Sequence, residues 1–241
     1  MNTLSQSLVS KRRKFSEIDF YPTPESITKA LMDRESFEGS IIEPACGNGA
    51  MSKVIKKYNK EVYSSDIQDL GYGDVRDFLD FVCINAYDNV ITNPPFIKGE
   101  EFVRKAKLIA RKKIAIFHRL LFLESSRRYS LFNDKSFPLS KVYVFCKRQN
   151  LFENGEKNKV SGTVAFAWFV WNKEYRGEPT IEWINEDIQK IRHSLNLSKE
   201  NEVKNGNNKN YKYVKSASQR LKQTNLSSHL PDNVYSNEIF I

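Results

Sequence analysis

The chain has 241 residues, of which 38 are Lys or Arg and 29 are Asp or Glu, so its formal net charge is +9 and its pI is near 9.3. This length suits one α/β domain with a full core and excludes several independent domains. A hydrophobic fraction of 40% is typical of a globular chain and argues against disorder throughout. The positive charge is compatible with a polyanionic partner.

The sequence carries no targeting or metal-binding signal. No apolar run approaches the roughly 20 residues that a membrane span needs, and residues 1–15 lack the apolar region of a secretory signal. We therefore expect a cytoplasmic protein without a membrane partner. Its three cysteines, Cys46, Cys83 and Cys146, are far apart, and its three histidines lack ligand spacing, so we expect neither a disulfide framework nor a metal site.

Composition divides the chain into three parts. Residues 1–19 are polar, include the basic run 11–14, and are predicted to form a flexible basic arm. Residues 20–184 are predicted to form the folded domain. Residues 185–241 are rich in Asn, Lys and Ser, which predicts a polar appendage that is loosely packed or partly disordered.

The domain begins with a predicted helix that opens at Thr23 or Pro24, has Glu25 in its first turn, and ends before Gly39. Beyond Gly39, short apolar runs alternate with amphipathic stretches, which is typical of a parallel sheet covered by helices. The expected strands are at 41–42, 62–63, 90–91 and 114–117, with another at 79–84 or just before it, and the expected helices are at 49–58 and 99–111.

Two apolar runs, 141–146 and 163–171, follow and are joined by a polar loop. They predict an antiparallel hairpin. The predicted fold is therefore α/β and Rossmann-like, with a mostly parallel sheet of about seven strands and a C-terminal antiparallel hairpin strand.

The segment Ile41–Gly49 leads from a strand through a Gly-x-Gly turn into a helix. Glycine lets the backbone approach a ligand, and the start of a helix offers free N–H groups. Asp66 follows Gly47 by nineteen residues and ends the second strand, where a carboxylate can accept both hydrogen bonds of a ribose diol. Either feature alone is compatible with an ordinary strand end, but the pair indicates a nucleotide-type ligand.

The most informative motif is Asn93–Phe96, which reads Asn-Pro-Pro-Phe and follows the fourth strand. Its two prolines fix the chain and remove backbone donors, so that stiffly held acceptors are left at the ligand edge of the sheet. Phe96 adds an aromatic ring for stacking.

Together with Glu43–Gly49, this motif resembles the S-adenosylmethionine-dependent amino methyltransferases that act on exocyclic nitrogens, and among them the adenine-N6 DNA methyltransferases. Thr23–Glu25 and Asp77–Leu79 are similar to further segments of that family and match its gamma-type order. Residues 20–24 and 167–171 are similar to small phage-type members. The resemblance spans about residues 20–172 and implies that 20–184 is a catalytic domain with the class I methyltransferase fold.

The resemblance also implies the cofactor, S-adenosylmethionine, which leaves as S-adenosylhomocysteine. Tyr21 and Thr23 would close over its methionine end, Glu43 would lie near its ammonium, Asp66 would hold the ribose, and Asp77 would accept from the adenine. The implied cofactor-binding residues are Tyr21, Thr23, Pro24, Glu43, Ala45, Cys46, Gly47, Asn48, Gly49, Asp66, Ile67, Asp77, Phe78 and Asn93.

The implied catalytic residues are Asn93, Pro94, Pro95 and Phe96. The Asn93 side-chain oxygen and the Pro94 carbonyl would accept the N–H bonds of the target amine and direct its lone pair at the methyl group, so no histidine base is needed. An adenine in duplex DNA would have to be flipped out and stacked on Phe96.

Loops after the fifth and sixth strands should lie on the same edge and contact DNA. The proposed DNA-binding residues are His118, Arg119, Arg127, Arg128, Lys147 and Arg148, with Lys157 and Lys159 nearby. The short chain leaves little room for a target-recognition domain, and a second subunit, as in a homodimer, is one way to supply one.

Three other functions stay open. An RNA adenine-N6 methyltransferase would use the same motifs. A protein-glutamine methyltransferase shares the Asn-Pro-Pro-aromatic motif, although the basic charge and the short N-terminal region disfavour it. A binding module that has lost catalysis is disfavoured by the intact Asn93 and Gly47.

Overall fold

The structure is a computed structural model that describes residues 21–58, 60–149, 151 and 164–185. The predicted basic arm, Lys157, Lys159 and nearly all of 185–241 lie outside these residues, so the three-part division of the chain stays a prediction.

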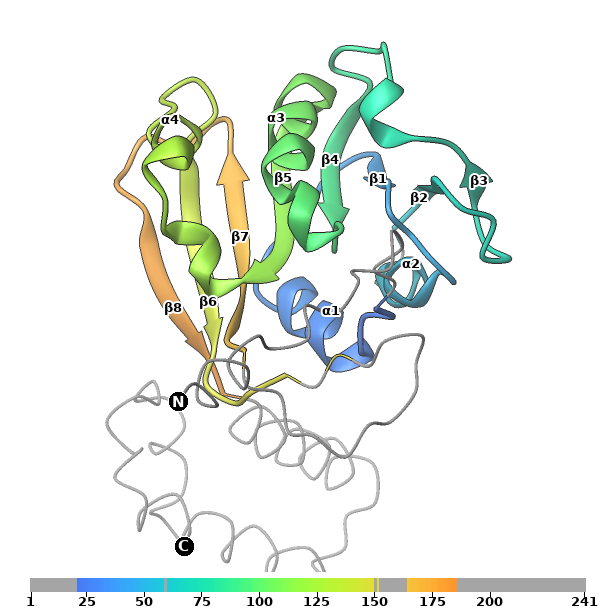
Figure 1. Ribbon diagram of the computed structural model, residues 1–241, viewed down its shortest axis with the longest axis horizontal. Coiled ribbons are helices and arrows are strands. Elements are labelled where there is room, and N and C mark those ends of the chain that lie inside the picture. Colours follow the sequence, from blue (N-terminus) through green and yellow to red (C-terminus); the bar gives the residue numbers. More distant parts are fainter. Residues whose placement is uncertain (1–20, 59, 150, 152–163, 186–241) are drawn as a thin grey trace, which may run out of the picture. The chain divides into compact units, whose positions relative to one another are not determined.

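A single mixed sheet forms the centre of the described residues, with eight strands in the order β3-β2-β1-β4-β5-β7-β6-β8 (Figure 1). The strands are β1 (Ile41–Glu43), β2 (Val62–Asp66), β3 (Asp74–Val75), β4 (Tyr87–Thr92), β5 (Ala110–Arg119), β6 (Leu139–Phe145), β7 (Phe166–Asn172) and β8 (Thr180–Ile184). Neighbours from β3 to β5 are parallel, β7 is antiparallel to both β5 and β6, and β8 is parallel to β6. The predicted Rossmann-like sheet with its antiparallel hairpin is confirmed.

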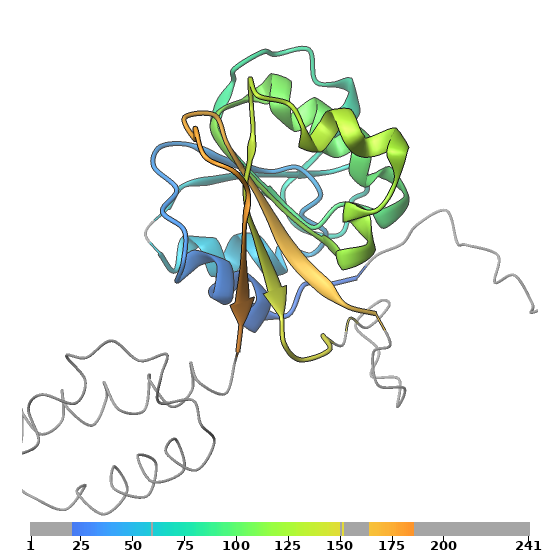
Figure 2. The same cartoon turned by 90° about the vertical axis from the view of Figure 1, so that its left-hand side faces the viewer.

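Helices cover both faces of this sheet. They are α1 (Glu25–Met32), α2 (Ala50–Lys56), α3 (Gly99–Ile109) and α4 (Tyr129–Phe132), with 3₁₀ helices at Phe78–Asp80, Phe96–Lys98, Leu120–Leu123 and Ser126–Arg128. Successive strand side chains point to opposite faces, so Ile41 joins the core under α1 and α2, whereas Ile42 joins the core under α3 and α4. Figure 2 shows the sheet between these two helical layers.

The structure differs from the sequence-based elements at one strand. The third strand is Asp74–Val75, which lies just before the 79–84 range, the second of the two predicted places, and Phe78–Asp80 forms a 3₁₀ turn. Strand β8 was not predicted. It lies at the sheet edge with only Ile184 buried, so it lacks the alternating apolar pattern by which a strand is recognised.

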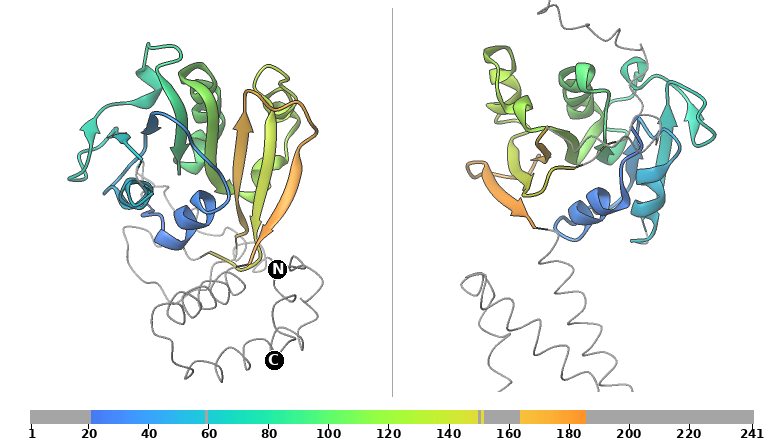
Figure 3. Two further views of the ribbon diagram at one scale, coloured as in Figure 1. Left: turned by 180° about the vertical axis from the view of Figure 1, so that it is seen from behind. Right: turned by 60° about the horizontal axis from the view of Figure 1, so that its bottom comes forward.

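Helix α1 is fixed to the sheet by a buried polar contact. Pro24 precedes its first turn, as predicted, and Glu25 is its first residue. The indole Nε1 of Trp168, on β7, donates to the carbonyl of Ile27 over 3.0 Å. Figure 3 shows α1 and α2 on the face opposite α3. This packing holds residues 21–24 beside the carboxyl ends of the parallel strands.

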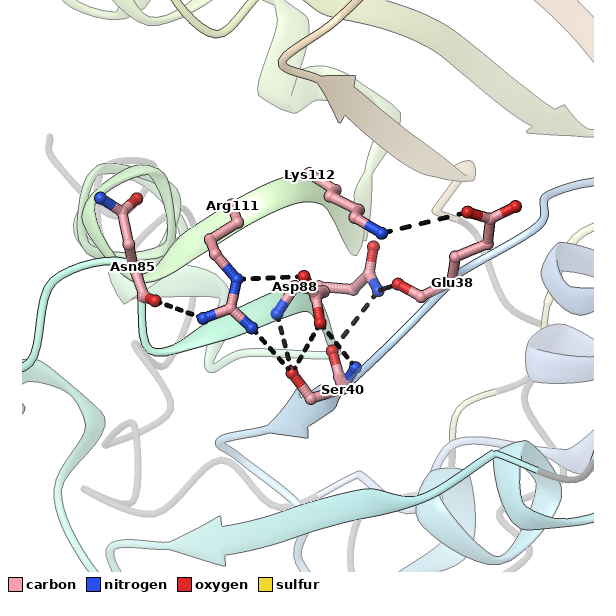
Figure 4. Close-up of polar contacts among 7 residues, drawn as sticks. Glu38, Ser40, Asn85, Asp88, Arg111 and Lys112 are labelled. Atoms are coloured by element: carbon pink, nitrogen blue, oxygen red, sulfur yellow. Dashed lines mark hydrogen bonds and ion pairs between the residues drawn. The ribbon is translucent and has the colours of Figure 1, made fainter.

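A polar cluster lies at the other ends of these strands, where β1, β4 and β5 begin (Figure 4). Asp88, on β4, accepts from Arg111 Nε at 3.0 Å and from the Ser40 backbone N–H at 2.9 Å. These bonds, that from Arg111 above all, hold the pKa of Asp88 well below its ordinary value. Arg111 also donates to the carbonyl of Asn85 over 2.6 Å. The cluster therefore ties together the beginnings of β1, β4 and β5.

Gly39 provides a test of this cluster. Its φ is +84°, and a Cβ there would overlap the Asp88 carboxylate, whereas Gly71 has φ +77° and open space around it. Gly71→Ala should lower the free energy of unfolding by about 1 kcal/mol through backbone strain alone. Gly39→Ala should lower it by about 2–3 kcal/mol, because it also displaces Asp88. Urea unfolding of the two variants measures the difference, and equal losses would mean that the cluster contributes nothing.

Candidate functional site

A cavity of about 170 Å³ opens at the carboxyl ends of β1, β2 and β4. Its wall includes most of the residues singled out in the sequence: Tyr21, Thr23, Glu43, Ala45, Cys46, Asn48, Asp66, Ile67, Asp77, Phe78, Asn93, Pro94, Pro95 and Phe96. Pro24 lies next to this wall at the start of α1, and Gly47 and Gly49 shape the turn behind it. The topology therefore brings segments from five separate parts of the chain into one site.

The glycine turn between β1 and α2 has a backbone that other residues rarely adopt. Gly47 has φ +54° and Gly49 has φ +77°. A Cβ at Gly49 would overlap the ring of Tyr72, which packs against the turn. Glycine is thus required at Gly49 both by conformation and by space.

Asp66 joins this turn to the end of β2. Its Oδ2 accepts from the Gly47 N–H at 2.8 Å and its Oδ1 accepts from the Gln68 N–H at 3.0 Å. Each carboxylate oxygen can accept a further hydrogen bond. The carboxylate is therefore held rigidly in the cavity wall with the capacity to bind a diol.

Glu43, at the end of β1, is 2% exposed. It accepts from the Ser52 hydroxyl, which lies 2.7 Å from the Ser64 hydroxyl. Burial raises the pKa of Glu43 to about 8 from an ordinary 4.5. A cation bound beside it would replace the lost hydration and favour the carboxylate form.

Cys46 lies near Glu43 but is not a nucleophile. Burial, reinforced by Glu43 and Asp66, raises the pKa of its thiol to about 12. The thiol Sγ lies 3.3 Å from the carbonyl oxygen of Tyr72 and can donate to it. Since the thiolate is the reactive form, Cys46 acts as a packing residue.

The side of the cavity near β2 and β3 combines apolar groups with one acid. Ile67 is 58% exposed next to Asp66, and Phe78 is fully buried against Phe102. Asp77 Oδ1 accepts from the Leu79 N–H at 2.8 Å, which fixes its carboxylate. A flat heteroaromatic ring with an amino group suits these surroundings.

Asn93 is oriented from one side only. Its Nδ2 donates to Thr23 Oγ1 at 3.0 Å and lies 3.5 Å from the Tyr21 carbonyl. Within the described part of the chain, the buried Oδ1 has no hydrogen-bond partner. Buried polar atoms are usually paired, so this residue of the cavity wall has an unused acceptor.

Phe96 forms the end of the cavity next to Asn93. Its ring stacks on Tyr21 at 6.1 Å between centroids and at an angle of 26°. The guanidinium of Arg119 lies over it, 4.7 Å from the centroid.

His118 is not the surface DNA contact that the sequence suggested. It is 5% exposed, its Nε2 lies 3.1 Å from the Phe96 carbonyl, and burial lowers its pKa to about 4. Its ring packs edge-on to Phe96 at 5.2 Å. The position of His118 near the end of β5 did not reveal that its side chain is buried. Its burial depends on contacts with Phe96 and with Gly99, where a Cβ would overlap the His118 ring.

The other predicted DNA-binding residues differ in their surroundings. Arg128 folds back, donating to the Phe122 carbonyl at 2.9 Å and to that of Glu124. Arg127 is exposed and lies 3.3 Å from Glu100. Lys147 and Arg148 are exposed after β6.

The sequence missed several residues of the cavity wall, among them Gln68, Leu70, Ile97 and Lys98. Ile97 and Lys98 directly follow the Asn-Pro-Pro-Phe motif, so extending that motif by two positions would have found them. Ile97 is 72% exposed, which is unusual for isoleucine and places an apolar group at the rim.

Within residues 21–58, 60–149, 151 and 164–185, no cluster of His, Cys, Asp and Glu side chains could hold a metal ion. No helix in this part of the chain is long and apolar enough to cross a membrane.

Searches against protein-family models and against curated proteins found no match. Solved structures with a similar fold include a protein from Vibrio vulnificus described as a modification subunit of a type I restriction enzyme (TM-score 0.50, 13% identity, 71% of this chain and 48% of that one). Others are a protein from Listeria monocytogenes described as a class I S-adenosylmethionine-dependent methyltransferase (TM-score 0.46, 13% identity, 67% and 62%) and magnesium protoporphyrin IX methyltransferase from Synechocystis with bound S-adenosylmethionine (TM-score 0.42, 12% identity, 62% and 76%).

The Rossmann-like fold of the described residues is thus shared with the Vibrio protein. The present chain spans about half the length of the Vibrio protein.

Glu43 should give folding stability a distinctive pH dependence. Its folded pKa is raised, so between pH 4.5 and about 8 the folded state retains a proton that the unfolded state has lost. Stability contributed by this group therefore falls as pH rises through that window and is level above it. Glu43→Gln should remove the fall, a difference on the order of a few kcal/mol.

Urea unfolding of both proteins from pH 4 to 9 checks this expectation. Ser52 can still donate to a glutamine oxygen, so the variant keeps its local packing. Parallel pH profiles would show that Glu43 titrates normally.

Proposed function

We propose that this protein transfers the methyl group of S-adenosylmethionine to the exocyclic N6 amino group of adenine in DNA, with the target base flipped out of the duplex. The observation that carries the proposal is the Asn93 amide. Its nitrogen is bonded to Thr23, and its buried oxygen has no partner among the described residues, although Asn93 belongs to the cavity wall. A target amino group would supply the donor that this oxygen lacks.

The cavity residues fit the cofactor. The Asp66 carboxylate would accept from the ribose hydroxyls while remaining bound to Gly47, and Glu43 would face the ammonium. Asp77 and Phe78 would bind the adenine, with Ile67 over it. Bound S-adenosylmethionine supplies an electrophilic methyl group.

The site's own contribution is alignment. The Asn93 oxygen and the Pro94 carbonyl accept from the target amine, which directs its lone pair away from the ring. The Tyr21 carbonyl, 3.5 Å from the Asn93 nitrogen, can only accept, so together with Thr23 it favours this orientation of the amide. The proton lost by the amine leaves to solvent, because the buried His118, with its pKa lowered to about 4, is not a base at neutral pH.

Positive charge beside the cavity supports a DNA substrate. Arg119, Arg127, Lys147 and Arg148 lie on β5 and on the loops after β5 and β6, and the net charge of +9 favours a polyanion. The fold shared with a protein described as a restriction-enzyme modification subunit is in keeping with this substrate.

The class of substrate is tested by incubating the purified protein with labelled S-adenosylmethionine and, separately, duplex DNA, RNA or bacterial release factor. Label recovered as N6-methyladenine from DNA alone supports the proposal. Label in RNA or in a glutamine side chain, without label in DNA, would replace it by the corresponding alternative.

Asn93→Ala should lower the rate of transfer at saturating substrate by about 10²–10³-fold, since it removes an acceptor aimed at the reacting group. Cofactor affinity, measured by calorimetry, should change far less than the rate. The matched control is Asn172→Ala, which should keep full activity. Asn172 lies at the end of β7 away from the cavity, where its side chain accepts from the Glu174 N–H in a turn. Near-normal methylation by Asn93→Ala would contradict the assignment.

Phe96→Ala should raise the KM for DNA by about 5–150-fold, the range expected for losing one base-stacking contact. Phe96→Tyr keeps the ring and should stay close to the original protein. Fluorescence of 2-aminopurine at the target position reports base placement directly. An unchanged KM for the alanine variant would remove Phe96 from the base site.

A further inference from the structure

Arg119, the last residue of β5, has no counter-ion among the residues that the structure describes. In the described part of the chain, its side chain forms no hydrogen bond or ion pair, and its buried Nε has no partner. Its contact is with Phe96, whose ring centroid lies 4.7 Å from Cζ. A partly buried cation without an acceptor is costly, unless an acceptor arrives with a ligand.

Several cations near Arg119 have partners. Lys107 lies 2.8 Å from Asp134, and Arg127 lies 3.3 Å from Glu100. Arg128 also stacks on a ring, that of Phe122, but donates to backbone carbonyls. Among the Lys and Arg side chains of the described residues, Arg119 is the one with a buried nitrogen that lacks a partner.

The contact with Phe96 leaves the donors of Arg119 usable. Stacking engages the flat face of a guanidinium, whereas its five N–H groups point outward in the plane. Two such groups match a pair of phosphate oxygens. Arg119 can thus cover Phe96 and bind a phosphate at the same time.

Arg119 and Phe96 are also linked through the His118 side chain. His118 precedes Arg119 on β5, and its Nε2 lies 3.1 Å from the Phe96 carbonyl, to which it can donate. The buried ring therefore fixes the end of β5 relative to the segment that follows β4. A phosphate on Arg119 would have a set position relative to a base beside Phe96.

We propose that Arg119 binds the phosphodiester that flanks the target adenine, so that the site selects a nucleotide within a strand over an isolated amine or a side-chain amide. This inference rests on the proposed function and deepens it. Arg119 is a positioning residue, because it places the target nucleotide and does not touch the reacting nitrogen.

The test pairs two variants with modified DNA. Once the methylated adenine has been mapped, duplexes are made in which each flanking phosphate in turn is replaced by an uncharged methylphosphonate. The original protein should bind one of these duplexes about tenfold or more weakly than unmodified DNA. Arg119→Met, which keeps an apolar stem over Phe96, should bind unmodified DNA equally weakly and lose nothing further on that duplex.

Two further readouts separate phosphate binding from simple support of Phe96. For Arg119→Met, the slope of log K against log salt should be shallower by about 0.9, the value for one phosphate contact. Its rate at saturating DNA should stay within a few-fold of the original. Arg176→Met is the control. Arg176 lies in the turn between β7 and β8, at the ends of the strands away from the cavity, and donates to backbone carbonyls over 2.9 Å. Arg176→Met should therefore keep both the salt slope and the methylphosphonate effect of the original protein.

The inference is wrong if Arg119→Met loses as much affinity as the original protein on every methylphosphonate duplex. It is also wrong if the salt slope of the variant is unchanged. In either case the original protein would still methylate DNA. A failure of the proposed function would be visible earlier and differently, as absence of N6-methyladenine when the original protein is given unmodified DNA.

Discussion

The site depends on the orientation of one amide. Asn93 follows β4, but the hydroxyl that holds its nitrogen belongs to Thr23, seventy residues earlier. Thr23 is in place because α1 buries Ile27 in the core and receives a hydrogen bond from Trp168 on β7. The direction of the Asn93 side-chain oxygen thus depends on packing between distant parts of the domain. The Tyr21 carbonyl, 3.5 Å from the same nitrogen, can only accept, so it disfavours the reversed amide, which would offer the cavity a donor instead.

The two ends of the strands differ in what their polar groups can contact. At the beginnings of the strands, Asp88, Arg111 and Ser40 bond to one another, although Asn89 Oδ1 there has no partner among the described residues. At the carboxyl ends, Asn93 Oδ1 and Arg119 Nε are also buried without partners among these residues. Unsatisfied polar groups cost stability, and these two belong to residues in or beside the cavity wall, where a ligand can supply partners.

Much of this arrangement was predictable from the sequence, for identifiable reasons. Val90 and Ile91 are apolar neighbours in a buried parallel strand, and the ends of such strands meet at one edge, so Asp66 and Asn93 could be placed near each other before the structure was known. Strand β8 could not be predicted, because an edge strand with exposed Ile181 and Trp183 has no buried face. The burial of His118 and the backward fold of Arg128 depend on contacts that no local pattern contains.

The position of β7 has a consequence for biosynthesis. This strand lies between β5 and β6, yet it is made after both. Until Phe166–Asn172 has left the ribosome, β5 has an unpaired edge, and neither β6 nor β8 can join the sheet. At a synthesis rate of roughly 5–20 residues per second, the apolar edge of β5 stays open for several seconds. A nascent chain halted before β7 would therefore display an aggregation-prone strand, so the vulnerable period is the synthesis of the residues from the end of β5 to the end of β7.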